Sequence, residues 1–277
     1  MKRRLTMACF VVALLLPLGL AAMPPSAQAA APSCPKVLFL GLHGVNDGGV
    51  ALPRAAQWGS TIDAVWQTFS SRATGVVTGR PIVYKRTVVD ISITNLWLAS
   101  QLAAITPDTD YAAGLLKDAL LDNRLRCGGT KVVLAGYSQG AWAIDKALRG
   151  TYAAGALGQL AVSNVKGAFL MGDPAYPDTS NGNGSPVRQG MATWLNMGYN
   201  RPADYLNNHV AGFRSICVSY TGDPYDPICM GRGGIPWSDI GVHSSYAGPA
   251  QNVRGVLVSS HGASDGGAFL ADRVNTP

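Results

Sequence analysis

The sequence predicts an α/β fold, a three-layer sandwich whose central, mostly parallel five-stranded sheet carries an insertion between its fourth and fifth strands. Short apolar runs of strand length alternate along the chain with segments of helical spacing, which is typical of a parallel sheet covered on both faces. The 277 residues suit one large domain, whose core needs no metal or oligomer for stability. Because 47% of the residues are hydrophobic and only 14% charged, the composition excludes a disordered chain.

The predicted strands are the apolar runs of the sequence. The first of them, KVLFLGL, is continuously apolar and ends in a Gly-Leu pair, as expected for a strand that is buried on both faces. The third, KVVLA, has the same character. The five strands are predicted at 36–42, 81–89, 131–135, 165–171 and 214–220.

The predicted helices lie between these strands. Ser60-Thr61-Ile62-Asp63 resembles a capping box and opens the first of them, and apolar residues recur at helical spacing through the second. The segment 172–212 is too long and too rich in turn residues for an ordinary connection, so we expect it to be a lid or a binding loop. The helices are predicted at 60–72, at 109–126, at 141–149 and within 249–260.

The first 29 residues have the parts of a secretory signal peptide. A positively charged start precedes an apolar run at 5–23, and Ala27-Gln28-Ala29 forms a small-residue cleavage site. A transmembrane anchor is the alternative, but Pro17 interrupts the run and the cleavage site follows it directly. We therefore expect cleavage near Ala29 and Ala30, and a secreted single domain at 30–277 with no stable membrane insertion.

The net charge is too small to indicate a nucleic-acid partner. The formal charge of +6 includes Lys2, Arg3 and Arg4, and without them 19 positive residues face 16 negative ones, which leaves +3. The sequence has no basic stripe with interleaved aromatic residues. We therefore expect no binding to nucleic acid.

Four cysteines remain once the leader with its Cys9 is removed. An even number in an exported chain indicates two disulfides, and no C-x-x-C spacing or adjacent histidine supports a metal site. Residues alone leave three pairings open. The four are Cys34, Cys127, Cys217 and Cys229.

The motif that carries chemistry is Gly136-Tyr137-Ser138-Gln139-Gly140. It matches G-x-S-x-G, follows a predicted strand directly and precedes a predicted helix, and this context predicts a nucleophile elbow. Such a turn raises the Ser138 hydroxyl at the carboxyl edge of the sheet. The backbone N–H of Gln139, at the start of the helix, would then donate to an oxyanion formed beside the serine.

A serine nucleophile needs a histidine base, and hydrolases of this type have the chain order serine, acid, histidine. That order excludes His43. His209 lies in the insertion, and His261 is surrounded by small polar residues near the end of the chain. His243, after the fifth strand, is the candidate that we favour as base over His261.

The acid that would orient this histidine is less well determined. Asp223 and Asp226 both follow the fifth strand, where a carboxylate can reach a neighbouring base, and Asp173 has the corresponding place after the fourth strand. We favour Asp223 and keep Asp226 as the alternative.

These features together resemble the cutinase family of secreted serine esterases. The elbow G-Y-S-Q-G has the family's own form, and Cys127 stands eleven residues before Ser138, as the family's cysteine does. The family's second pair of cysteines brackets its acid in a C-x-x-G-D-x-x-C pattern followed by H-x-x-Y, here spread from Cys217 to Tyr246. The resemblance implies the pairs Cys34–Cys127 and Cys217–Cys229. Within the longer acid loop, Gly222-Asp223 fits the family's G-D, whereas Asp226 fits its distance to the second cysteine.

The second oxyanion donor departs from the family pattern. The family often places a hydroxyl residue after an Arg-Gly pair in the first loop, but this chain has His43-Gly44-Val45-Asn46. Val45 can offer only its backbone N–H, and Asn46 is the alternative donor. The insertion gives a looser similarity to the phage lysin B esterases, which cleave mycolyl esters of bacterial cell walls.

The sequence thus predicts a secreted serine ester hydrolase with a Ser138–His243–Asp223 triad, an acyl-enzyme and no metal or cofactor. The substrate would be a lipid, a polyester or an acylated polysaccharide, and the protein a monomer. An acyltransferase or a phospholipase would use the same triad. A non-catalytic binding protein on a hydrolase scaffold is a further alternative.

Overall fold

The sheet of the computed structural model contains five parallel strands in the order β2-β1-β3-β4-β5. The structure describes residues 33–45, 47, 57–84, 95–176, 190–194, 205–218, 224–230, 239–247, 250–258 and 260–276. The strands are β1 (Val37–Leu42), β2 (Val77–Pro81), β3 (Lys131–Tyr137), β4 (Val165–Met171) and β5 (Phe213–Ile216). All four pairings are parallel, so the predicted fold class is confirmed.

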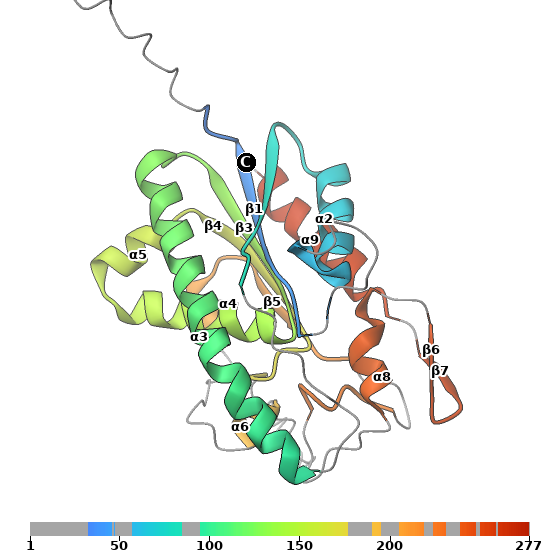
Figure 1. The fold of residues 1–277 in the computed structure, drawn as a ribbon. Helices are drawn as coiled ribbons and strands as arrows, with labels where there is room; N and C mark the ends of the chain where they lie inside the picture. Colours follow the sequence, from blue (N-terminus) through green and yellow to red (C-terminus); the bar gives the residue numbers. More distant parts are fainter. Residues whose placement is uncertain are drawn as a thin grey trace, which may run out of the picture. The chain divides into compact units, whose positions relative to one another are not determined.

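Helices cover both faces of this sheet (Figure 1). One face carries α3 and α4, and the other carries α2 and α9, which pack on each other. The longer helices are α2 (Ser60–Arg72), α3 (Asn95–Arg126), α4 (Gln139–Ala153), α5 (Ala156–Val162) and α9 (Gly262–Asn275). The short ones are α6 (Met191–Trp194), α7 (Tyr205–His209) and α8 (Ile240–His243), which continues as the 3-10 turn Ser244–Tyr246. In the part of the chain that the structure describes, no helix is long and apolar enough to cross a bilayer.

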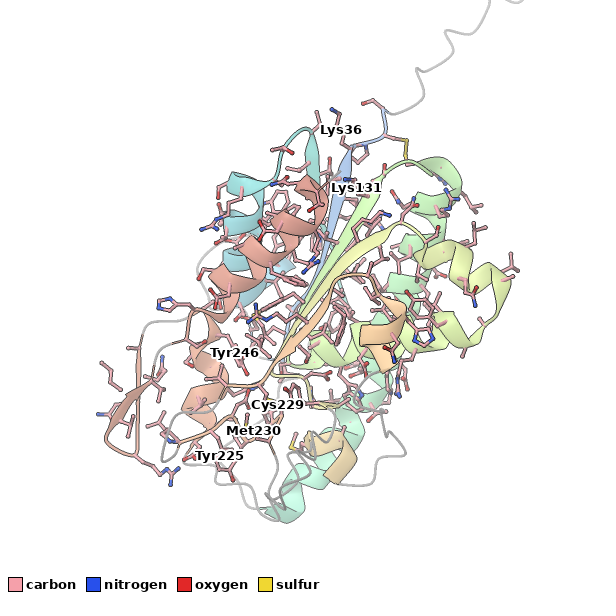
Figure 2. The ribbon with its side chains drawn as sticks, turned by 180° about the vertical axis from the view of Figure 1, so that it is seen from behind. Lys36, Lys131, Tyr225, Cys229, Met230 and Tyr246 are labelled. Carbon is pink, nitrogen blue, oxygen red and sulfur yellow. A yellow bond between two sulfur atoms is a disulfide. The ribbon has the colours of Figure 1, made fainter. Side chains whose placement is uncertain are left out.

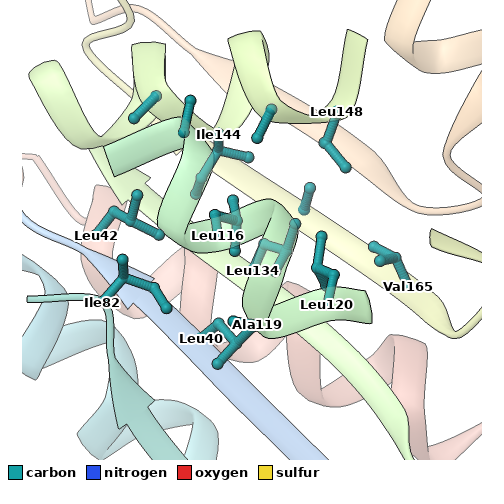
Figure 3. Close-up of a cluster of buried hydrophobic side chains, with 14 of the residues drawn as sticks. Leu40, Leu42, Ile82, Leu116, Ala119, Leu120, Leu134, Ile144, Leu148 and Val165 are labelled. Atoms are coloured by element: carbon teal, nitrogen blue, oxygen red, sulfur yellow. The ribbon is translucent and has the colours of Figure 1, made fainter. Parts of the chain in front are cut away.

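The alternation of side chains along β1 divides the core into two halves. Leu40 and its neighbours two residues away face α3 and α4, in the cluster of Figure 3. Phe39 points the opposite way, into a cluster rich in aromatic residues with α2 and α9. Because β1 and β3 are buried on both faces, their carboxyl ends are held in place by packing from both sides.

Two elements, β2 and α3, begin four or more residues earlier than predicted. The second strand covers Val77–Pro81 rather than 81–89; it is a half-exposed edge strand without the apolar run that the prediction followed, and 85–89 lie outside the described residues. Helix α3 begins at Asn95 and contains Pro107, a residue that ends most helices. Packing of the following turns against α4 therefore outweighs the local preference.

The start of α2 is capped from a distance. Ser60 lies inside the helix, and the predicted capping box is not formed. Instead, the buried carboxylate of Asp47 accepts hydrogen bonds from the Ser60 hydroxyl (2.8 Å) and the Thr61 N–H (3.3 Å). This side chain ties the loop after β1 to the helix that covers it.

The prediction of a last helix within 249–260 was wrong. This segment forms the antiparallel hairpin β6 (Gln251–Val253) and β7 (Val256–Val258), and the last helix is α9. Arg254 and Gly255 between the strands have φ angles of 50° and 81°, which is the conformation of a tight two-residue hairpin turn. The strands are only three residues long, which is too short to show a period in the sequence.

Candidate active site

Ser138 lies at the turn between β3 and α4, as the motif predicts. Its φ of 53° and ψ of −119° place it in a region that residues with a side chain rarely occupy. The Ser138 N–H donates to the Met171 carbonyl at the end of β4 (2.8 Å), and a Cβ at Gly140 would collide with the Leu42 carbonyl oxygen. The elbow therefore depends on close backbone approach between neighbouring strand ends, which only glycine at position 140 allows.

The two backbone donors predicted for the oxyanion lie on either side of Ser138. Gln139 is the first residue of α4, so its N–H has no acceptor within the helix. The loop after β1 passes directly beside the serine, because a Cβ at Gly44 would lie 3.0 Å from the Ser138 Cβ. Val45 follows in this loop and packs on an apolar cluster, and Asn46 lies outside the described residues.

His243, at the end of α8, is bonded to a buried carboxylate. Its Nδ1 lies 3.0 and 2.9 Å from the two carboxylate oxygens of Asp226, which is fully buried. The same carboxylate accepts hydrogen bonds from the Tyr246 hydroxyl (2.8 Å) and the Ile228 N–H (2.9 Å). Because a carboxylate only accepts, Nδ1 carries the proton and Nε2 keeps a free lone pair, as a general base requires.

His243 also packs on the residue that precedes the nucleophile. The rings of Tyr137 and His243 are stacked with their centroids 5.0 Å apart, and the Tyr137 hydroxyl donates to the His243 carbonyl (2.7 Å). A Cβ at Gly172, just after β4, would lie 2.6 Å from the His243 Cε1. These contacts place the imidazole at the same edge of the sheet as Ser138. The hydrogen bonds of the two residues do not include one from the Ser138 hydroxyl to Nε2, a bond that is often long in active sites without substrate.

The geometry favours Asp226, the alternative, over Asp223 as the carboxylate that holds His243. Asp223 lies outside the described residues. Asp173, the third candidate, accepts a hydrogen bond from the Ala175 N–H (2.9 Å) within the turn after β4. Loop length explains the ambiguity, since both aspartates follow β5 but only the folded loop decides which one faces the imidazole.

The other histidines have different surroundings. His43 is buried in the loop beside Ser138, where its ring stacks on Tyr84. His209, at the end of α7, packs on Tyr152 of α4, and His261 is the exposed residue that precedes α9. Among the described residues, the histidine that bonds the Asp226 carboxylate is His243.

Two disulfides have the pairing that the resemblance implies. Cys34–Cys127 joins the start of β1 to the end of α3, and Cys217–Cys229 closes a short loop around the acid. The two sulfurs of the second bond and the Asp226 carboxylate lie within 4.8 Å of one another, the spacing of a metal site. Because the two thiols are oxidised to a disulfide, they are not available as ligands.

Burial raises the pKa values of the two tyrosine hydroxyls beside His243 and Asp226. Burial, and then the nearby carboxylates of Asp47 and Asp226, raise the pKa of the Tyr137 hydroxyl well above its usual value. Burial and the Asp226 carboxylate do the same to the pKa of Tyr246. Both phenols therefore stay protonated donors at a pH at which a free tyrosine begins to ionise. Figure 2 shows Tyr225, Cys229 and Tyr246 together at one end of the sheet, opposite Lys36 and Lys131.

A family comparison identifies the family of this chain. The Cutinase family model matches residues 85–255, which include Ser138, Asp226 and His243. The chain belongs to the cutinase family. Among curated relatives, it is 36% identical over 129 residues to an acetylxylan esterase of Hypocrea jecorina, covering 43% of this chain and 37% of that protein. It is 35% identical over 132 residues to cutinase 11 of Verticillium dahliae, covering 44% and 39%. The cutinase-family chain thus spans less than half the length of these two relatives.

Solved structures share the fold. A cutinase-like protein from Cryptococcus sp. matches with a TM-score of 0.54 at 19% identity, covering 89% of this chain and 98% of that one. An acetylxylan esterase matches with a TM-score of 0.51 at 21% identity, covering 87% and 100%. Lysin B from Mycobacteriophage D29 reaches only 0.46 at 14% identity, which is too low to bear on function.

Sequence reasoning missed the contacts that two tyrosines of this cutinase-family chain make with Asp226 and His243. Tyr246 stands three residues after His243, one helical turn away, so the H-x-x-Y spacing was a signal for a second partner of the acid. Tyr137 is the second residue of the elbow pentapeptide, and nothing in its spacing indicates that it stacks on the histidine.

Proposed function

We propose that this cutinase-family protein is a secreted serine carboxylic-ester hydrolase that acts through Ser138, His243 and Asp226. The observation that supports this most is the bond between the His243 Nδ1 and the buried Asp226 carboxylate, in an imidazole stacked on Tyr137 beside the elbow. That bond provides a base in the required tautomer, and the elbow provides a serine.

The first step forms an acyl-enzyme. The Ser138 hydroxyl attacks the ester carbonyl while the His243 Nε2 takes its proton, and the Asp226 carboxylate stabilises the imidazolium. The N–H groups of Gln139 and Val45 donate to the oxyanion of the tetrahedral intermediate. The imidazolium then protonates the leaving alcohol, and the C–O ester bond breaks.

The second step regenerates the enzyme. Water attacks the acyl-Ser138 ester while the His243 Nε2 takes one of its protons. The second tetrahedral intermediate collapses, the carboxylic acid leaves, and the proton returns to the Ser138 oxygen. No metal or organic cofactor takes part in either step.

The substrate is an ester with an apolar acyl part. Val45 from the first loop and Ile228 from the acid loop belong to one apolar cluster with Ile105 of α3 and Trp142 of α4. These side chains come from the segments that flank Ser138. Because Ile105, Trp142 and Ile228 are buried, an apolar acyl group would meet this cluster at the partly exposed Val45. Relatives named cutinase and acetylxylan esterase support polyesters and acylated polysaccharides as the classes to test first.

The first experiment measures hydrolysis of p-nitrophenyl esters, from acetyl to long acyl chains, by the purified protein. Ser138→Ala should lower kcat by about 10⁴-fold or more, because triad members act as a unit. Ser264→Ala is the matched control, since its hydroxyl lies on the surface of α9 and bonds only the turn before it. An organophosphonate should add once to the parent and not to Ser138→Ala.

Other outcomes assign the function differently. If neither hydrolysis nor an adduct is seen, the scaffold binds rather than cleaves esters. If an adduct forms but acyl groups pass to an added alcohol faster than to water, the protein is an acyltransferase. Secretion is tested separately by sequencing the protein recovered from the medium, whose first residue should lie near Ala30.

A further inference from the structure

The β6–β7 hairpin packs directly on the helix that carries His243. A Cβ at Gly241 in α8 would lie 2.6 Å from the Val253 Cγ2 of β6. Val242, the neighbour of His243, shares a buried apolar cluster with Val253 and Val258 of the hairpin, and Val218 packs against the same cluster. The hairpin therefore contacts α8 and the strand end that leads into the acid loop.

Val218 links this cluster to the acid. Its carbonyl accepts a hydrogen bond from the Asp226 N–H (2.9 Å), and its own N–H donates to the Tyr246 hydroxyl (3.1 Å). Tyr246 in turn donates to the Asp226 carboxylate. A shift of the hairpin would thus be passed to both members of the acid–base pair.

An ion pair between the exposed Arg254 and the buried Asp239 anchors the tip of the hairpin. The Arg254 guanidinium binds both carboxylate oxygens of Asp239, with Nε 2.6 Å from Oδ1 and a terminal nitrogen donating to Oδ2 at 2.6 Å. Asp239 is fully buried and immediately precedes α8, but its side chain makes no capping bond to that helix. Its Oδ2 instead accepts from the N–H of Tyr225, the residue before the catalytic acid (3.4 Å).

The backbone of Arg254 has a conformation that is unfavourable for a residue with a side chain. Among the described residues, only Ser138 and Arg254 have a positive φ without being glycine. The turn of such a hairpin prefers asparagine or aspartate before its glycine. An arginine there costs stability locally, which indicates that the guanidinium has a task that a better turn residue could not perform.

We propose that Arg254 is a positioning residue for the ester hydrolysis. Through Asp239 it joins the start of α8, which carries His243, to the segment that carries Asp226. It thereby keeps the His243 imidazole and the Asp226 carboxylate at hydrogen-bonding distance. The inference rests on the proposed function and assigns to it a residue eleven positions beyond the base in the chain.

The test compares Arg254→Asn with the parent. Asparagine is favoured at this position of the turn, so Arg254→Asn removes the ion pair while the backbone conformation of the hairpin is kept. Arg126→Asn is the matched control, because Arg126 pairs with Asp122 at 2.5 Å on the exposed end of α3. We measure kcat and KM on p-nitrophenyl acetate for protein whose active serines are counted by phosphonate titration.

The expected result is a kcat at least about tenfold lower in Arg254→Asn, with KM within about a factor of two, since small displacements of catalytic groups carry large rate penalties. Arg126→Asn should match the parent. The proton on the His243 Nδ1 gives a second readout by NMR, because its resonance lies far downfield while the imidazole is bonded to a carboxylate. That resonance should broaden or move upfield in Arg254→Asn alone.

The proposal would be overturned if Arg254→Asn had the same kcat as the parent and the same resonance of the His243 Nδ1 proton. Should loss of the guanidinium beside the buried Asp239 carboxylate prevent folding, Asp239→Asn/Arg254→Asn carries the test, because it removes both charges of the ion pair. The double variant should fold and have a reduced kcat, and a kcat equal to that of the parent would count against the proposal. If the parent itself hydrolyses no ester, the proposed function fails, whereas the NMR comparison still decides whether Arg254 positions His243.

Discussion

Ser138 and His243 lie in regions of the molecule that are built differently. The elbow is the continuation of β3, between β1 and β4, and its neighbours are buried by apolar side chains on both faces of the sheet. His243 ends a helix of four residues, and Asp226 lies in a loop. The second region is held by the small apolar cluster that Val242 shares with the hairpin, and by polar and covalent links, namely one disulfide, two tyrosine hydroxyls and one ion pair.

Because of this difference, activity can be changed with little loss of stability in the region around His243 but not in the elbow. A change in the elbow disturbs the core and therefore affects folding as well as the nucleophile. A change in the links around His243 disturbs few apolar contacts, so it should reduce the rate while most of the fold survives.

The largest effect is expected from the acid itself. Asp226→Asn should lower kcat by about 10⁴-fold, because an amide favours the wrong tautomer of His243 while its size hardly disturbs the packing. Asp223→Asn is the matched control and should keep most of the parent rate. Kinetics on p-nitrophenyl acetate decide between them, and the opposite ranking would return the triad to Asp223.

The two disulfides should differ in the same way, one affecting stability alone and the other affecting both stability and kcat. Cys34–Cys127 closes a separation of 93 residues far from the site, so replacing both cysteines by serine should lower the free energy of unfolding by about 4–5 kcal/mol with little change in kcat. Cys217–Cys229 closes only 12 residues around Asp226, so its loss should lower that free energy by about 3 kcal/mol and reduce kcat as well. Denaturant titration and kinetics on both variants test this, and equal effects on kcat would break the contrast.

The smallest effect concerns the buried phenols at alkaline pH. Tyr137 and Tyr246 have raised pKa values in the folded state, so above the usual value of 10.0 the unfolded chain loses protons that the folded chain keeps. Their contribution to stability is complete below that pH and is lost as the pH rises through the raised pKa values. The free energy of unfolding should fall by up to about 1.4 kcal/mol per pH unit for each phenol.

Tyr246→Phe should remove one of these two contributions and so make the alkaline slope shallower. Urea titrations between about pH 9 and 11 measure it. An unchanged slope would mean that the Tyr246 hydroxyl titrates normally and does not donate to Asp226 throughout this range. Tyr111→Phe, an exposed tyrosine on α3, serves as the control.

Local pattern was enough for the sheet and the nucleophile. The run 165–171 was predicted with the bounds that β4 has, and the elbow was predicted from five residues and their flanks. Buried strands are apolar throughout, and a strained turn needs particular glycines, so both leave a mark in the sequence itself. The half-exposed edge strand β2 has no such mark, and its prediction was displaced.

The α/β class and the elbow could therefore be predicted from the sequence, because both follow from residues that are neighbours in the chain. The tertiary structure alone decided which aspartate meets His243, that Asp47 caps α2, and that Arg254 reaches Asp239 from the tip of a hairpin. Each of these is a contact between polar side chains on separate segments. Its partner depends on loop paths and on burial, which cooperative packing of the whole domain sets and which no local period encodes.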